Sequence, residues 1–140
     1  MTMYDKIVDI AKLYIGFPYL WGGQSPLNGF DCSGLVVEVL KSVGLISDTA
    51  DFTAQQFYYI FKRVNAPSKG YLVCYGSSPS NVTHIGICID EELMIESAPG
   101  GSKVDSIKSA IKTDSRVRIR PIMRRIDIVG YVDPLGMFKF

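Results

Sequence analysis

The sequence predicts an α+β fold in which N-terminal helices pack on a central antiparallel sheet. Apolar residues recur at helical spacing in the first half of the chain, whereas short alternating segments follow one another in the second half. The 140 residues contain no internal repeat, low-complexity tract or long linker, which favours one domain spanning residues 1–140.

Local start and stop signals place the predicted helices. Three are expected, at residues 4–15, 32–43 and 52–64. Gly16 is a natural stop for the first helix, and Asp31 is a suitable N-cap for the second. Thr53 and Gln56 have the spacing of a capping box at the start of the third.

Alternation predicts the strands of the second half. They are expected at residues 71–75, 84–89, 93–97, 116–121 and 128–132. In the second of these, isoleucines occupy one face, and His84, Gly86 and Cys88 occupy the other. If that other face meets the helix that begins at Cys32, Gly86 leaves room for a close approach.

Composition excludes several classes of protein. A net charge of +1 gives no global reason to expect a nucleic-acid partner. The three cysteines include no C-x-x-C pair, which argues against a disulfide framework and a zinc site. No apolar run is long enough to insert through a membrane, and the first residues lack the pattern of a secretory signal. The sequence leaves the oligomeric state open.

Cys32 is a candidate nucleophile because it would begin the second helix. The free N–H groups and the positive dipole end at this position favour a thiolate, so we expect a pKa below the usual value of about 8.5. The alternative is a buried, unreactive cysteine. Cys74 and Cys88 lie inside apolar strands, where packing in the core is the better interpretation.

His84 is the only histidine and therefore the only histidine base available to a cysteine nucleophile. A tight hairpin around Asp90 and Glu91 would pair His84 directly with Glu96 on the same face. Glu96 would then orient the imidazole, as the third member of a triad does. The alternatives are a histidine bonded to a loop and a solvated strand glutamate.

Several motifs occur in an order that resembles one known family. They are "FPYLWGG" at 17–23, "DCSGLV" at 31–36, "TAQQ" at 53–56, "KGYLVCY" at 69–75, "THIGICID" at 83–90 and "MIESAPGG" at 94–101. This series resembles the NlpC family of papain-like cysteine peptidases, most of which cut peptide bonds in bacterial peptidoglycan. The resemblance implies a minimal papain-like fold, acyl transfer through a thioester, and no need for a metal or organic cofactor.

Carried over residue by residue, the resemblance assigns four catalytic positions. Cys32 matches the nucleophile and His84 the base, while Tyr19 matches a tyrosine whose hydroxyl helps to bind the oxyanion. Glu96 stands where the family usually has His, Asn or Gln. A carboxylate at this position is expected to strengthen an ion pair with imidazolium and to shift the pH optimum. The alternative for Tyr19 is an aromatic core residue.

Two further features have two interpretations each, and a third carries a single expectation. Trp21 either lines the substrate groove or plugs the core. The five arginines within residues 116–125 form a solvated, charge-protected edge strand, which we favour, or contact an anionic wall polymer or a substrate carboxylate. Residues 76–83 are expected to form a loop before His84 that gates the site.

The favoured function is hydrolysis of amide bonds in peptidoglycan stem peptides. Because no signal is seen, delivery to the cell wall by a phage or as a secreted effector is expected; the alternative is that the sequence is part of a longer protein. Two alternatives remain: a noncatalytic structural or binding protein that keeps the fold, such as a phage tail component, and an amidase or acyltransferase of the same fold that acts on another substrate.

Overall fold

The computed structural model describes residues 1–25, 29–99, 106–112 and 114–137. Its helices are α1 (Met3–Leu13), α2 (Cys32–Ser42), α3 (Ala54–Ile60), α4 (Ile107–Lys112) and the 3-10 helix η1 (Ile122–Arg124). Strands β1 (Gln24–Ser25) and β2 (Gly29–Phe30) form a small separate pair. The main sheet contains β3 (Phe61–Val64), β4 (Leu72–Ser78), β5 (Asn81–Cys88), β6 (Leu93–Ala98), β7 (Arg116–Pro121) and β8 (Ile128–Met137).

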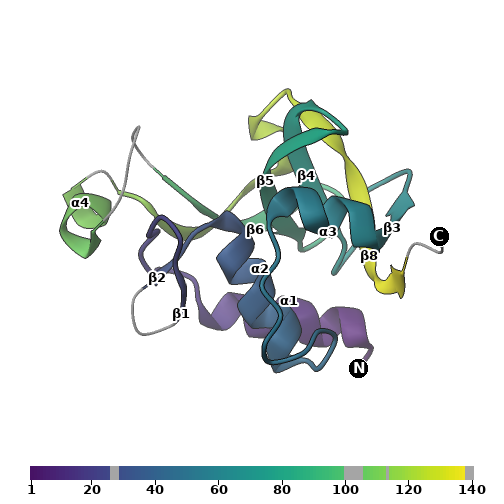
Figure 1. Ribbon diagram of the computed structural model, residues 1–140, viewed down its shortest axis with the longest axis horizontal. Helices are drawn as coiled ribbons and strands as arrows, with labels where there is room; N and C mark the ends of the chain where they lie inside the picture. Colours follow the sequence, from purple (N-terminus) through teal and green to yellow (C-terminus); the bar gives the residue numbers. More distant parts are fainter. Residues whose placement is uncertain (26–28, 100–105, 113, 138–140) are drawn as a thin grey trace.

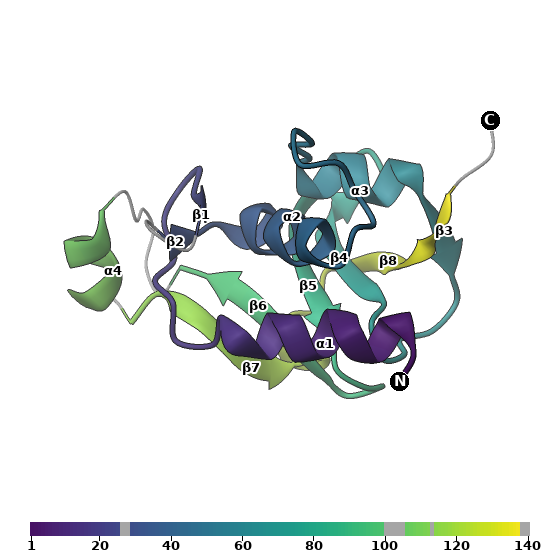
Figure 2. The ribbon, with the colours of Figure 1, turned by 90° about the horizontal axis from the view of Figure 1, so that it is seen from below.

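The main sheet is antiparallel throughout, in the order β3-β8-β4-β5-β6-β7. Helices α2 and α3 pack on it, and α1 lies beside α2 (Figures 1 and 2). Helix α4 lies at the end of the molecule away from the C-terminus (Figure 1). The predicted α+β fold, with N-terminal helices on an antiparallel sheet, is confirmed.

Local capping signals fix the starts of the three N-terminal helices. Thr2 and Thr53 each form a capping box at the start of α1 and α3, and the Asp31 side chain caps α2. These caps satisfy N–H groups that have no partner within a helix. The predicted helix starts therefore agree with the structure to within two residues.

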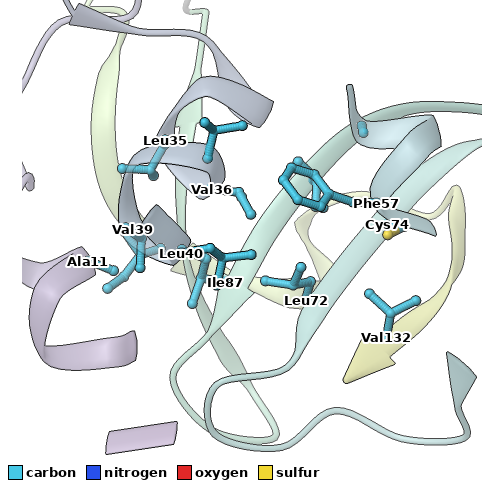
Figure 3. Close-up of a cluster of buried hydrophobic side chains, with 14 of the residues drawn as sticks. Ala11, Leu35, Val36, Val39, Leu40, Phe57, Leu72, Cys74, Ile87 and Val132 are labelled. Atoms are coloured by element: carbon cyan, nitrogen blue, oxygen red, sulfur yellow. The ribbon is translucent and has the colours of Figure 1, made fainter. Parts of the chain in front are cut away.

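The main core lies between the helices and one face of the sheet. Figure 3 shows Ala11 of α1, Leu40 of α2 and Phe57 of α3 converging with sheet residues such as Leu72 and Ile87. All of these side chains are buried. Their burial is the main source of stability for this layer, because each large apolar side chain contributes about 1.5–3 kcal/mol.

The opposite face of the sheet carries a smaller apolar cluster, formed by Val73, Tyr75, Cys88, Met94 and Ile122. Gly86 lies on this face: a Cβ there would come within 2.7 Å of the Met94 sulfur. The expectation that Gly86 makes room for α2 is therefore wrong. Alternation along β5 instead turns its neighbours Ile85 and Ile87 toward the helices.

The structure corrects two element predictions. Residues 52–64 are not one helix, because α3 ends at Ile60 and β3 continues the chain as a strand paired with β8. Pairing with a distant strand overrides the helical pattern at this edge. Residues 76–83 are mostly strand, since β4 reaches Ser78 and β5 begins at Asn81. They form no loop of the kind expected to gate the site.

Candidate active site

Cys32 begins α2 in a tightly fixed first turn. The preceding residue, Asp31, accepts hydrogen bonds from the Gly34 N–H at 2.6 Å and from the Gly22 N–H at 3.1 Å. A Cβ at Gly34 would lie 1.9 Å from the Gly23 carbonyl oxygen, so no side chain fits there. The loop before the helix is thus held against the turn that presents the thiol.

Backbone and side-chain bonds join this turn to the sheet. The Phe30 carbonyl accepts from the Leu20 N–H at 3.0 Å and from the buried Ser97 hydroxyl at 2.7 Å. Ser97 belongs to β6, the strand that also carries Glu96. These bonds fix the turn that precedes Cys32 relative to strand β6, which carries Glu96.

Three of the predicted catalytic residues line one cavity of about 420 Å³. Tyr19, Cys32 and His84 all contribute to its wall, together with Trp21 and Arg125. Trp21 is 72% exposed, so the interpretation of it as a core plug is wrong. The Cys32 sulfur lies 3.9 Å from the carbonyl oxygen of Thr83, the residue before His84.

His84 and Glu96 are in contact, although not through the expected register. Strands β5 and β6 pair Ile87 with Ile95 and Cys88 with Met94, so Glu96 is not directly opposite His84. The register differs by two residues, which preserves the side-chain face. The His84 Nε2 atom lies 2.5 Å from Glu96 Oε1, and both side chains are buried.

Glu96 also accepts hydrogen bonds from Arg124, at 2.5 Å from Nε to Oε2 and at 2.8 Å from Nη2 to Oε1. Burial alone would raise the pKa of Glu96, but the bonds from His84 and Arg124 outweigh burial and lower the pKa to about 2. Glu96 is therefore ionised near neutral pH and can only accept hydrogen bonds. It follows that His84 Nε2 donates, which leaves Nδ1 of a neutral ring free as an acceptor.

The thiol and the imidazole both favour their uncharged forms. Burial, followed by the charge of Asp31, raises the pKa of Cys32 to about 12. The N–H groups of Cys32 and Ser33 at the helix N-terminus lower this pKa, as expected, but burial is larger, so the expected net decrease is wrong. Burial also lowers the pKa of His84, although Glu96 opposes it. Glu96 therefore acts in the expected direction, in favour of the imidazolium, but its effect on the pKa of His84 is smaller than that of burial.

Tyr19 is in a position to donate a hydrogen bond from the cavity wall. Burial, with smaller contributions from Cys32 and Asp31, raises the pKa of Tyr19 to about 12. Its hydroxyl therefore keeps its proton near neutral pH. Tyr19 is only 5% exposed and its N–H bonds to the Ser115 carbonyl, so the residue is both fixed in the fold and part of the cavity wall.

Cys74 and Cys88 differ from Cys32 in their surroundings. Each belongs to an apolar cluster, one on each face of the sheet, and both are fully buried. Burial raises the pKa of both thiols. The prediction that these two cysteines pack in the core is confirmed.

The arginine segment contains functional neighbours that the sequence analysis missed. Strand β7 is an edge strand, as predicted, and Arg116 pairs with Asp114. Arg124, however, reaches the buried Glu96. A signal was present in the sequence: a buried carboxylate needs a cation, and five arginines lie within residues 116–125. Which arginine supplies it depends on how η1 turns back over the sheet.

Two searches of the described part of the chain concern metals and membranes. Within residues 1–25, 29–99, 106–112 and 114–137, no group of three or more His, Cys, Asp or Glu side chains is placed to hold a metal ion. Among the helices formed by the same residues, none is long and apolar enough to cross a bilayer.

Comparison with known proteins agrees with this geometry. Residues 16–120 match the model of the NlpC/P60 family. The chain is 33% identical over 121 residues to the bifunctional muramidase/DL-endopeptidase CwlT of Bacillus subtilis, covering 84% of this chain and 36% of that protein. It spans about a third of the length of the curated relatives that it matches.

Solved structures of NlpC/P60 proteins share the fold. A family member from Bacillus cereus superposes with a TM-score of 0.75 at 23% identity, over 95% of this chain and 40% of that one. RipD from Mycobacterium tuberculosis, a non-catalytic NlpC/p60 domain protein adapted to peptidoglycan binding, superposes with a TM-score of 0.70 at 20% identity, over 95% and 98% of the two chains. With three quarters of its length matched by the family model, the chain belongs to the NlpC/P60 family.

Proposed function

We propose that this chain is a cysteine peptidase that hydrolyses amide bonds in peptidoglycan stem peptides at the bacterial cell wall. One observation carries the proposal: the cavity that holds Cys32 also holds His84, whose far nitrogen is fixed by a buried carboxylate. Relatives named as a DL-endopeptidase and a murein DD-endopeptidase support peptidoglycan as the substrate class. No step requires a metal or a cofactor.

The first chemical step joins the thiol to the substrate carbonyl. Nδ1 of neutral His84 takes the proton from Cys32 as the sulfur attacks the carbonyl carbon. The imidazolium that forms is stabilised by Glu96, which accepts from Nε2. The proton moves to the imidazole as the carbon–sulfur bond forms.

The oxyanion of the tetrahedral intermediate needs donors that are already in place. The backbone N–H of Cys32, in the first turn of α2, is one, and the Tyr19 hydroxyl on the cavity wall is the other. As the intermediate collapses, the imidazolium gives its proton to the leaving amine. Water then attacks the thioester with His84 as base, which releases the acid and restores the thiol.

A noncatalytic binding role is the second candidate, and Glu96 is the observation that favours it. The glutamate departs from the family's usual residues, and the fold is shared with RipD, which is non-catalytic. Against this role, Glu96 makes the hydrogen bond to His84 that an orienting residue must make. Cys32 also remains in a cavity beside the histidine.

The test compares the release of muropeptides from purified peptidoglycan by the parent chain, Cys32→Ala and His84→Ala. Both variants are expected to lose about 10³-fold or more in rate while keeping their circular dichroism spectra. Cys88→Ala is the matched control, because it removes a thiol outside the cavity and should keep the parent rate. Muropeptide release by Cys32→Ala at the parent rate would exclude the mechanism.

A further inference from the structure

We propose that Arg124 is a positioning residue for catalysis, and that Glu96 and Arg124 together act on His84 as one neutral hydrogen-bond acceptor. The inference deepens the proposed function and rests on it, because it explains how a glutamate serves where the resemblance leads one to expect an uncharged group or a histidine. Its basis is the arrangement of hydrogen bonds and charges around Glu96.

The two side chains form a forked pair that fixes the carboxylate. Glu96 Oε2 accepts from Arg124 Nε, and Glu96 Oε1 accepts from Arg124 Nη2. The same Oε1 accepts from His84 Nε2. Two parallel bonds to a planar guanidinium determine the orientation of a carboxylate more tightly than one bond does. The atom that faces His84 is therefore held by Arg124.

The pairing is selective among the arginines of this region. Arg118 lies directly opposite Glu96 in the β6–β7 ladder, yet its Nη1 bonds to Asp114. Arg120 is more distant, with its Nε 3.9 Å from Glu96 Oε2. Arg124 reaches the carboxylate from the end of η1, where the chain turns away from β7. The close cation therefore comes from η1 and not from the cross-strand neighbour.

Charge explains why the pair matters to the histidine. An unpaired carboxylate 2.5 Å from His84 Nε2 would favour the imidazolium and make Nδ1 a donor, unable to take the thiol proton. Arg124 offsets that negative charge and keeps the hydrogen bond. Consistent with this, burial lowers the pKa of His84, and the charges of Arg125 and Arg124 add to that effect against Glu96.

Several other groups share the cavity with His84 or interact with its ring, and the pair must be tested among them. Those that carry or can acquire charge come from the cavity wall, from β4 and from the segment after η1: Tyr19, Asp31, Cys32, Tyr75, Arg125 and Asp127. Arg125 is itself paired with Asp127 through two hydrogen bonds. The test therefore changes only Glu96 and Arg124 and leaves these other groups in place.

The test uses proton NMR of the histidine ring, which gives the pKa of His84 directly because the chain has one histidine. Arg124→Met should raise this pKa by about one to three pH units, since the carboxylate is left uncompensated. Glu96→Gln should lower it further, since the guanidinium is left uncompensated. In the double variant Glu96→Gln/Arg124→Met both charges are gone, and the pKa should return close to the parent value.

Peptidoglycan hydrolysis by the same proteins gives a second readout. Each single variant should lose about tenfold or more in kcat/KM, with the acid limb of Arg124→Met moved to higher pH. The double variant should be faster than either single variant. Arg116→Met is the matched control, because it removes one positive charge from the same segment at a residue paired with Asp114. It should leave both the titration and the rate unchanged.

Two results would overturn the inference: an unchanged pKa of His84 in a folded Arg124→Met, or a double variant slower than both single variants. An arginine that only stabilised the fold would lower the melting temperature without opposite shifts in the two single variants. The titration needs no substrate. If the shifts occur and the parent chain hydrolyses no peptidoglycan, then the proposed function fails and the charge compensation stands.

Discussion

The two faces of the central sheet bury different kinds of side chain. The face covered by α1, α2 and α3 buries aliphatic and aromatic residues in one continuous cluster. The opposite face buries a smaller apolar cluster beside the charged network of His84, Glu96 and Arg124. The helix-covered face therefore accounts for most of the stability and is contacted by Cys32, whereas the opposite face holds the charged network around His84.

Strand alternation produces this division. In β5, Ile85 and Ile87 point to the helices, while His84 and Cys88 point to the opposite face. Glu96 in β6 likewise lies between Ile95 and Ser97, which point the other way toward the core and Phe30. The same short segments thus carry core residues and residues that we propose to be catalytic, and the two kinds of mutation should have separable effects.

The largest stability effect is expected on the helix-covered face. Leu40→Ala should lower the free energy of unfolding by about 2–5 kcal/mol, because the side chain is fully buried against several elements. Urea denaturation measures this loss. The control is Ile126→Ala, which removes a residue that is 98% exposed and should change stability by about 0.5 kcal/mol or less. Equal losses in the two variants would show that this face is not the main core.

A smaller effect, on rate, is expected at the cavity wall. Tyr19→Phe removes the hydroxyl proposed to bind the oxyanion and should lower kcat by about tenfold to a hundredfold with little change in KM. Tyr59→Phe removes a hydroxyl from a half-exposed residue outside the cavity and serves as the control. Steady-state kinetics on a peptidoglycan fragment separates kcat from KM. A change confined to KM would assign Tyr19 to substrate binding.

What the sequence predicts depends on how close in the chain the interacting residues are. Helix starts were predictable, because caps such as Asp31 and Thr53 act over three or four residues. Cys32, His84 and Tyr19 were found from motifs, and the structure places them around one cavity. Strand β3 was missed, because its pairing with β8 joins segments far apart in the chain.

The errors at the candidate site have a common physical cause. The direction of the Cys32 pKa depends on burial, and the cation beside Glu96 depends on the turn at η1. Neither burial nor that turn is encoded in a short segment. The contact between His84 and Glu96 was predicted despite the wrong register, because a shift of two residues keeps a side chain on its face.

The smallest effect that we predict is a pH dependence of stability that comes from the polar face. Burial lowers the pKa of His84 in the folded chain, whereas the unfolded chain has the ordinary value of about 6.5. Below that pH the unfolded state binds a proton that the folded state does not. Protonation of His84 should therefore leave the free energy of unfolding unchanged above about pH 6.5. Below that pH it should lower the free energy of unfolding by at most about 1.4 kcal/mol per pH unit.

Urea denaturation between about pH 7 and pH 5 measures this slope. This window lies above the pH at which Glu96 titrates in the unfolded chain. His84→Gln keeps an amide donor for Glu96 but cannot bind the proton, so it should show a flatter slope than the parent chain. The difference between the two slopes measures the contribution of His84, because the carboxylates contribute equally to both proteins. Identical slopes in both proteins would mean that His84 titrates alike in the folded and unfolded states. The polar face would then not hold the histidine in its uncharged form.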